Sequence, residues 1–367
     1  MNHPLGRFAA QEIRSLGRRV ASHYYTAPVA PSLRMTEREC DLGRNDAQRS
    51  VRHDKFTDEP YHVPRMKLID GKALAAAIRA EVADDVKKLP SPPGLGVLLV
   101  GDDPASRVYV GLKEKTATEA GIRTDIRRLP ASATDDELVG IIRQWNEDGS
   151  VNAILVQLPL PSGHDTDKVV SAVHPMKDVD GFHPANVEAL FEGTGLIIPP
   201  VHEGIMRLIA STGLDPRGKS ATIIANSDTF ADPLHHLLRR AGFVTAMMQP
   251  DDLDAETLLQ SDVAVVAIGR PGFLGSDLVK NGAVVIDVGT TKDERGCVRG
   301  DADMEDFRNK DVWITPVPGG VGPMTVALLL KNVVRLVELQ RPSRSLSRAE
   351  PRGSGCQRLA TRSSSRE

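Results

Sequence analysis

The sequence lacks several features that would assign it to a broad class. It has no apolar run approaching the roughly 18 residues that a helix needs to span a bilayer, so a membrane protein is not expected. Its cysteines, Cys40, Cys297 and Cys356, have neither CxxC nor metal-ligand spacing, which argues against a metal site and favours a reducing, cytoplasmic compartment. The net charge of −3 over 367 residues gives no nucleic-acid-binding footprint.

The two ends of the chain differ in composition from its middle. Residues 1–65 are polar and mixed in charge, and they are predicted to be a disordered extension. The first 34 residues hold five arginines and one acid, Glu12, as in a transit peptide, but an unstructured extension is the favoured interpretation. Residues 341–367 hold seven serines and seven arginines and are predicted to be a disordered tail. The folded part is therefore expected at about residues 66–340.

Within that part, short apolar runs alternate with helical patterns. Strands are predicted at 94–100, 153–157, 220–225, 263–268 and 283–288, and helices at 74–88, 106–120, 135–146, 203–213, 233–241 and 326–339. Continuous apolar strands between helices indicate parallel sheets covered on both faces. We predict two α/β domains around a cleft. The first comprises residues 66–198 with a C-terminal helix at 324–340, and the second, at 199–323, is a Rossmann-like doubly wound sheet.

Residues 318–325, PGGVGPMT, form the most specific string in the chain. Three glycines and two prolines in eight positions are not expected inside a regular helix or strand. The string follows an apolar stretch at 312–314 and precedes a helical pattern, which is where α/β proteins hold ligands. Pro318, Gly319 and Gly320 are therefore candidate binding residues, although a generic Gly/Pro loop is more often a plain connection.

Two further candidates lie on a helix and at a strand end. Tyr109 and Lys113 are four residues apart, so on a helix they share one face, where a ring can stack on a ligand beside a proton donor. Partial burial would lower the pKa of the lysine toward neutrality, although such a pair is more often a solvated face. Gln157 follows a buried strand, where its amide can bind a ligand or simply cap the strand.

Two loops carry carboxylates. In KDVDG, residues 177–181, Asp178 or Asp180 can bind the donor-rich edge of a ring, and a metal is less favoured because no further ligands follow at regular spacing. The loop at 225–233 follows a strand, where a dinucleotide-binding turn would be glycine-rich. It contains no glycine and places Asp228 and Asp232 where phosphates would lie, so it is a poor NAD(P) loop.

These strings together resemble the bifunctional methylenetetrahydrofolate dehydrogenase/methenyltetrahydrofolate cyclohydrolase family over about residues 66–339. The matching motifs are KLIDGK at 67–72, VGDDPAS at 100–106, YVxxK at 109–113, VQLPLP at 156–161, KDVDG at 177–181, VIDVG at 285–289 and TPVPGGVGPMT at 315–325. The family oxidises 5,10-methylenetetrahydrofolate with NAD(P)+ and hydrolyses the methenyl product to 10-formyltetrahydrofolate. The resemblance implies a homodimer that handles tetrahydrofolate derivatives in one-carbon metabolism and purine biosynthesis.

The resemblance also implies residue roles. Lys113 corresponds to the acid–base lysine of hydrolysis, Gln157 to the group that tunes it, and Asp180 to the carboxylate that binds the pterin edge. Tyr109 corresponds to the ring that stacks on the folate, and the Pro318–Gly320 loop lines the same cleft. The candidate residues for NADP, or for NAD, are Ala225, Asn226, Ser227 and Thr290.

The departures from the family concentrate on the dinucleotide side. The usual Gly-Arg-Ser is Ala225-Asn226-Ser227, a later glycine is Ala231, and the Pro-Cys-Thr-Pro string is replaced at 199–202. The arginine that can meet a 2′-phosphate is thus absent. The leading hypothesis is the bifunctional enzyme. The alternatives are a cyclohydrolase-only paralogue with a non-functional dinucleotide site, and a non-catalytic folate-binding protein.

Overall fold

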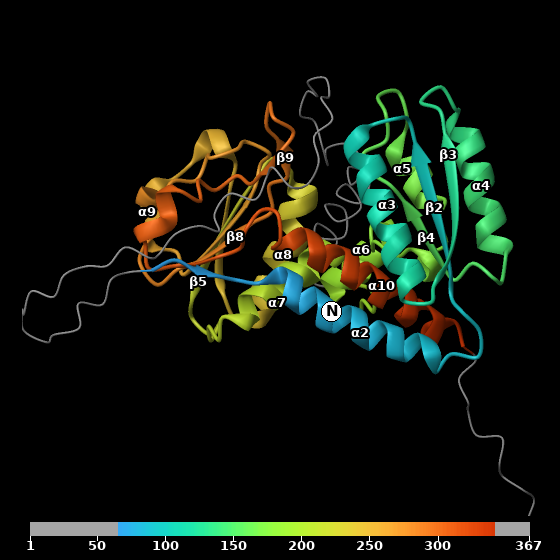
Figure 1. Ribbon diagram of the computed structural model, residues 1–367, viewed down its shortest axis with the longest axis horizontal. Helices are drawn as coiled ribbons and strands as arrows, with labels where there is room; N and C mark the ends of the chain where they lie inside the picture. Colours follow the sequence, from blue (N-terminus) through green and yellow to red (C-terminus); the bar gives the residue numbers. More distant parts are fainter. Residues whose placement is uncertain (1–64, 342–367) are drawn as a thin grey trace, which may run out of the picture.

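The computed structural model describes residues 65–341. The expectations for residues 1–65 and 341–367 lie outside the described residues, apart from Arg65 and Arg341. The described part forms two lobes, each built on a parallel sheet, and two long helices, α2 and α10, run beneath both (Figure 1). The prediction of two α/β units is confirmed, whereas the division at residues 198 and 199 stays a prediction. Between residues 65 and 341, no helix is long and apolar enough to cross a membrane.

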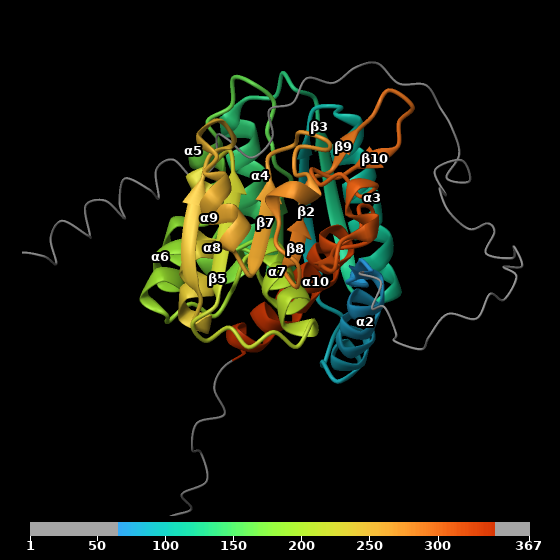
Figure 2. The same cartoon turned by 90° about the vertical axis from the view of Figure 1, so that its left-hand side faces the viewer.

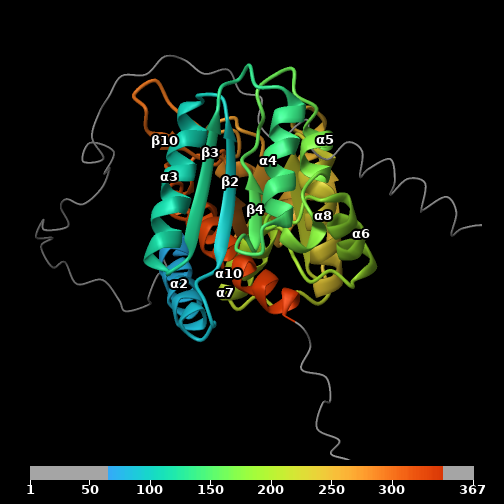
Figure 3. The ribbon, with the colours of Figure 1, turned by 90° about the vertical axis from the view of Figure 1, so that its right-hand side faces the viewer.

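The first sheet has three parallel strands in the order β3-β2-β4 (Figure 3). Its central strand β2 is apolar on both faces and fully buried, because helices cover both faces of the sheet. Leu95 and Leu99 pack toward α2 and α3, while Leu98 packs toward α4 and α5. The elements of this lobe are β2 (Gly94–Val100), α3 (Pro104–Glu119), β3 (Arg123–Leu129), α4 (Asp135–Glu147), β4 (Ala153–Val156), α5 (Thr166–Ser171), η2 (Pro175–Lys177) and α6 (Pro184–Glu192).

The second sheet has six strands in the order β1-β11-β8-β7-β5-β6, all paired in parallel (Figure 2). It alternates strands with helices as predicted, and α7 and α8 pack on one face. Its elements are β1 (Lys67–Leu68), α7 (Pro200–Ser211), β5 (Ser220–Ala225), α8 (Asp228–Ala241), β6 (Val244–Met248), η3 (Pro250–Asp252), α9 (Ala255–Gln260), β7 (Val263–Ala267), η4 (Ser276–Leu278), β8 (Val284–Asp287), η5 (Asp306–Asn309) and β11 (Trp313–Ile314). A separate hairpin pairs β9 (Thr291–Lys292) with β10 (Val298–Arg299).

The long helices α2 (Gly71–Lys87) and α10 (Val321–Gln340) pack against each other. The C-terminal helix, predicted to begin at residue 324 or 326, begins earlier, at Val321, so residues 321–325 of the PGGVGPMT string are helical. Pro323 is tolerated in its first turn, since the N–H that proline lacks would have no partner within the helix there. Of this string, only Pro318, Gly319 and Gly320 belong to the connection between β11 and α10, which spans residues 315–320. A Cβ atom on Gly71 would lie 2.1 Å from the Gly320 carbonyl oxygen, so the two backbones meet where only glycine fits.

The helix predicted at 233–241 begins earlier, at Asp228. Ser227 caps it by accepting a hydrogen bond from the Thr229 N–H at 3.2 Å. Pro233 lies inside the helix and is buried together with Phe230. The carboxylates of Asp228 and Asp232 therefore belong to the first turns of a helix, not to a loop.

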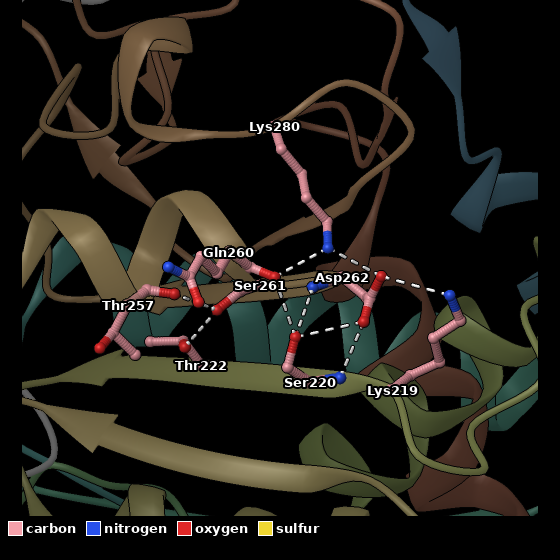
Figure 4. A network of polar contacts seen from close by, with 8 residues as sticks. All are labelled: Lys219, Ser220, Thr222, Thr257, Gln260, Ser261, Asp262 and Lys280. Carbon is pink, nitrogen blue, oxygen red and sulfur yellow. Dashed lines mark hydrogen bonds and ion pairs between the residues drawn. The ribbon is translucent and has the colours of Figure 1, made fainter.

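The amino ends of β5 and β7 are joined by a polar network at the edge opposite to the candidate site (Figure 4). The Asp262 carboxylate accepts hydrogen bonds from Lys280 Nζ at 2.9 Å and from the Ser220 N–H at 2.9 Å. Lys219 Nζ lies 3.5 Å from the same carboxylate. Burial alone would raise the pKa of Asp262, but the hydrogen bonds and charge of Lys280 and Ser220 lower it to about 2.

We expect this network to make stability depend on pH below 4. Since the folded-state pKa of Asp262 lies below its ordinary value of 3.8, its contribution is present above about pH 4 and is lost as pH falls through about 2. Asp262→Asn should lower the free energy of unfolding by about 2 kcal/mol at pH 7, and by much less near pH 2. Urea unfolding at several pH values measures this. Asp84→Asn, in an exposed pair with Lys87, is the control and should leave stability unchanged; an equal loss in both variants would contradict the assignment.

Candidate functional site

Lys113 and Gln157 meet between α3 and β4. Asp103 caps α3 by accepting a hydrogen bond from the Ser106 N–H at 2.7 Å, so the helix that carries Lys113 begins at the carboxyl end of β2. Gln157 follows β4 directly, and its backbone N–H donates to the Leu98 carbonyl of β2 at 2.9 Å. The Lys113 Nζ donates to Gln157 Oε1 at 3.0 Å. The structure thus brings together two predicted residues that are 44 positions apart.

Lys113 is only 7% exposed, which is unusual for a lysine. Burial disfavours its ammonium form and lowers the pKa of Lys113, while the negative charge of Asp180 acts in the opposite direction. Burial raises the pKa of Asp180 to about 6, against the attraction of the Lys113 charge. The charges of Lys113 and Asp180 therefore interact in a poorly solvated environment, where a small change in the surroundings shifts the pKa of either group.

The structure distinguishes the two carboxylates of the KDVDG segment. Asp178 is buried and points to the backbone, where it accepts hydrogen bonds from the Gly181 N–H at 3.0 Å and the His183 N–H at 2.8 Å. Asn186, which sequence reasoning missed because a lone asparagine carries no signal, donates a third hydrogen bond to Asp178 at 2.8 Å. Asp178 thus stabilises the conformation of the loop, and Asp180 is the carboxylate whose charge interacts with that of Lys113.

Asp180 also lines a small pocket with apolar walls, to which Val156, Leu158 and Phe182 contribute. Asp178 lines the same pocket, but its oxygens already accept hydrogen bonds from the Gly181 and His183 N–H groups and from Asn186, so Asp180 is the carboxylate that is more available to a ligand. Tyr109 reaches toward this side of the molecule from α3, because its Oη lies 3.5 Å from the position a Cβ would occupy on Gly322. Tyr109 therefore lies beside the start of α10, next to the predicted Pro318–Gly320 loop.

The second group of candidates lies at the carboxyl ends of β5 and β7. From β5 the chain goes to β6 on one side and then crosses to β7 on the other side of β5, so the direction of the strand order reverses here. Open α/β sheets bind ligands at such a switch point. Asn226 follows β5, and its amide donates to the Ile268 carbonyl after β7 at 2.6 Å. This hydrogen bond ties together the two loops between which a dinucleotide phosphate would lie.

The first turns of α8 are a poor match for phosphates. The Thr229 N–H is used by the Ser227 cap, and Phe230 and Ala231 are buried where a glycine-rich turn would leave room for a ligand. Burial and the charge of Asp228 raise the pKa of Asp232, so the two carboxylates crowd the same place. A dinucleotide thus fits the fold of this lobe but not the residues that line its switch point.

Buried carboxylates hold the neighbouring loops in place. Asp301 accepts hydrogen bonds from the Ile268 N–H at 2.7 Å and the Gly269 N–H at 3.1 Å, and Asp287 accepts one from the Gly289 N–H at 2.9 Å. Thr290, a predicted cofactor residue, follows Gly289 and is carried by this framework. These hydrogen bonds hold the backbone of the loops after β7 and β8, so the folded chain itself determines the shape of the switch point.

Comparison with known proteins identifies the family. The family model described as the tetrahydrofolate dehydrogenase/cyclohydrolase catalytic domain matches residues 69–180, and the model of its NAD(P)-binding domain matches residues 199–341. Bifunctional protein FolD from Halothermothrix orenii is 46% identical over 276 residues, which cover 73% of this chain and 97% of that protein. The chain belongs to the bifunctional tetrahydrofolate dehydrogenase/cyclohydrolase family.

Solved structures of family members agree with the fold. The Campylobacter jejuni bifunctional FolD enzyme is 40% identical with a TM-score of 0.72, covering 75% of this chain and all of that one. Trypanosoma brucei FolD, complexed with NADP cofactor and an inhibitor, is 33% identical with the same TM-score, covering 75% of this chain and 98% of that one. The resemblance expected from the motifs is thus confirmed, including the NAD(P)-binding domain.

One further departure from the usual family residues is His202, in the string that replaces Pro-Cys-Thr-Pro. His202 lies in α7 and is completely buried, with its Nε2 2.9 Å from the Phe230 carbonyl oxygen. Burial lowers the pKa of His202 to about 4, so the ring is neutral at physiological pH and its Nε2–H donates to that carbonyl. His202 of α7 therefore contacts the first turn of α8 through Phe230.

The pairing of Lys113 with Asp180 has a measurable electrostatic consequence. Lys113→Met keeps much of the side-chain volume and removes the charge that lowers the pKa of Asp180, so this pKa should rise above about 6. A carboxyl-carbon NMR titration measures it. Lys115→Met, on the same helix but exposed, is the control and should change nothing. An unchanged Asp180 pKa in Lys113→Met would contradict the pairing.

Proposed function

We propose that this chain oxidises 5,10-methylenetetrahydrofolate to 5,10-methenyltetrahydrofolate and hydrolyses the product to 10-formyltetrahydrofolate in one-carbon metabolism. The observation that carries the proposal is the 3.0 Å hydrogen bond from buried Lys113 to Gln157 in a member of this family. A protein that only bound folate would gain nothing from desolvating a lysine, because burial of the ammonium costs free energy.

In this proposal Asp180 binds the pterin edge. Its carboxylate accepts hydrogen bonds from the amino group and the adjacent ring N–H, a charge-assisted pair that also fixes the orientation of the ring. The apolar pocket walls exclude water from that contact, and Tyr109 stacks on the folate beside the Pro318–Gly320 loop. Since the pKa of Asp180 is about 6, this contact weakens below that pH.

Lys113 acts as the acid and base of hydrolysis. Water adds to the methenyl carbon that bridges the two folate nitrogens, and Lys113 takes the released proton. The hydroxyl group on that carbon then releases its proton to solvent as the C=O bond forms. The bond from the carbon to the ring nitrogen breaks, and Lys113 returns its proton to that nitrogen, which leaves the formyl group on the other nitrogen. The lowered pKa makes the neutral amine easier to reach, and Gln157 Oε1 holds the amine in place by accepting a hydrogen bond from it.

The oxidation half needs a nicotinamide dinucleotide, which accepts the hydride. The residues at the switch point match such a ligand poorly, and Asn226 offers no cationic partner for a 2′-phosphate. We therefore propose that NADP+ binds weakly, that the affinity for NAD+ is reduced less than that for NADP+, and that hydrolysis is the faster half-reaction. The second candidate, a cyclohydrolase that uses no dinucleotide, is favoured by the same Asn226 contact. The homodimer stays a prediction from the family.

The role of Lys113 can be tested with methenyltetrahydrofolate supplied directly. Lys113→Met should lower kcat for its hydrolysis by about 10²–10⁴-fold, as expected for the loss of a general acid–base group. The decay of the methenyl absorbance measures the rate. Lys115→Met should hydrolyse at the wild-type rate. Wild-type hydrolysis no faster than the uncatalysed rate would instead support the non-catalytic folate-binding protein.

The role of Asn226 can be tested by restoring a cation. Asn226→Arg removes the contact with Ile268 and supplies a bidentate donor, so the Kd for NADP+ should fall by about tenfold or more, with a smaller change for NAD+. Calorimetric titration of both nucleotides measures this. Gln260→Arg adds the same charge at the opposite edge of the sheet and should change neither Kd. Equal gains for both nucleotides in Asn226→Arg would contradict a 2′-phosphate role.

Methenyl formation by the wild type, read as growth of its absorbance, decides whether the dehydrogenase half operates. Turnover with either nucleotide supports the bifunctional enzyme. Turnover with neither, together with normal hydrolysis, supports the cyclohydrolase-only candidate.

A further inference from the structure

Asn332 lies in the middle of α10 and is completely buried. Its amide nitrogen donates to two backbone carbonyls from different parts of the chain, to Val179 at 3.1 Å and to Ile198 at 3.0 Å. Val179 immediately precedes Asp180. Ile198 belongs to the segment that leads from the first lobe into α7. One side chain thus contacts both the Asp180 loop and the connection to the second lobe.

The orientation of this amide is fixed by Arg335, one turn further along α10. Arg335 Nη1 donates to Asn332 Oδ1 at 3.0 Å, and because a guanidinium has only donors, the amide nitrogen must face the two carbonyls. Arg335 is in turn held by Glu203 of α7, at 2.7 Å and 3.2 Å. Glu203 also accepts from Arg207 Nε at 2.9 Å, so its buried charge is shared by two cations.

The backbone around Asp180 is held from both sides. Before it, the Val179 N–H donates to Ile154 of β4 at 3.3 Å, while the Val179 carbonyl accepts from Asn332. After it, the Gly181 N–H donates to the Asp178 carboxylate at 3.0 Å. Of these contacts, the one from Asn332 also reaches the connection at Ile198. It therefore links the placement of Asp180 to α10 and, through Arg335 and Glu203, to α7.

We propose that Asn332 is a positioning residue for Asp180, and that the chain Asn332–Arg335–Glu203 sets the place of this carboxylate relative to the second lobe. The proposal rests on the proposed role of Asp180 in binding the pterin edge. If Asn332 cannot donate, the Val179 and Ile198 carbonyls lose their buried partner and the segment relaxes toward other donors. Asp180 then moves relative to both the pterin pocket and Lys113.

The test compares KM and kcat for the hydrolysis of methenyltetrahydrofolate. Asn332→Asp keeps the size of the side chain and can still pair with Arg335, but it cannot donate to the two carbonyls when ionised. Its KM should rise about tenfold, the effect of about one lost hydrogen-bonding contact, while kcat at saturating substrate changes less than threefold. A purely structural role would instead lower the amount of active enzyme, so Vmax would fall at constant KM.

A second variant avoids the risk that Asn332→Asp does not fold. Arg335→Gln leaves the Asn332 amide in place but removes the guanidinium that orients it, so the KM should rise in the same direction by a smaller factor. Thr222→Val is the control. It removes a buried hydrogen bond to the Ser261 hydroxyl at 2.6 Å in the second lobe, away from the Asp180 loop and the connection, and its KM should equal that of the wild type.

The dependence of KM on pH provides a measurement that a general loss of stability would leave unchanged. As Asp180 shifts away from Lys113, it loses the attraction that opposes the rise of its pKa, so the pH below which KM increases should move upward in both variants. Wild-type KM and an unmoved profile in folded Asn332→Asp and Arg335→Gln would overturn the inference. Asp180→Asn separates the two proposals. If it leaves KM unchanged, the role of Asp180 itself fails; if it raises KM while the Asn332 and Arg335 variants do not, only the positioning role fails.

Discussion

The burial of α10 is the constraint on which the arrangement of this chain depends. The helix is apolar on nearly all sides, and from Val321 to Leu336 most of its residues are buried. Such a helix cannot lie on a surface and must be covered by other elements all round. Here α2 and α7 pack against it, and α3 contributes further contacts. Because α2 and α3 belong with the first lobe and α7 with the second, burying α10 fixes one lobe against the other.

This single burial also accounts for the position of the site. The Pro318–Gly320 connection must lie where β11 ends and α10 starts, and the close contact of Gly71 with Gly320 places it at the start of α2. Farther along the same helix, Asn332 contacts the segment that carries Asp180. A segment late in the sequence thus contributes one part of the candidate site and a contact that holds another part, although the Lys113–Gln157 pair itself lies on α3 and after β4.

Much of this fold could be predicted from the sequence, because a short, continuous apolar run is stable as a strand only when both of its faces are buried. The strands at 94–100 and 220–225 were predicted with their observed ends, since both are buried on both faces. β3 was missed because it is an edge strand with arginines at 123, 127 and 128, and its exposed residues hide the apolar pattern. The early start of α8 was missed because a proline usually marks a helix boundary, whereas burial of Phe230 and the Ser227 cap favour helix before Pro233.

The site was predictable to a different degree. Tyr109 and Lys113 share a helical face, so their proximity follows from spacing alone, and family motifs supplied Gln157 and Asp180. Nothing local distinguished Asp178 from Asp180. Their separation depends on Asn186 and on backbone N–H groups that reach only one of them. Asn332 carried no signal at all, because a single asparagine in an apolar helix shows its role only when the carbonyls it faces are known.

The proposed folate and dinucleotide sides of the site differ in the charges that they carry. On the folate side, a buried lysine and a carboxylate oppose each other, so each stabilises the charged form of the other while burial acts against both. On the dinucleotide side, Asp228 and Asp232 carry like charges near the start of α8, and burial and repulsion act together to raise the pKa of Asp232. A phosphate added there would be a third negative group in a place that already disfavours two. The folate side can therefore bind a neutral ring without electrostatic repulsion. The dinucleotide side can bind a dinucleotide only at an electrostatic cost, which other contacts of the dinucleotide must offset.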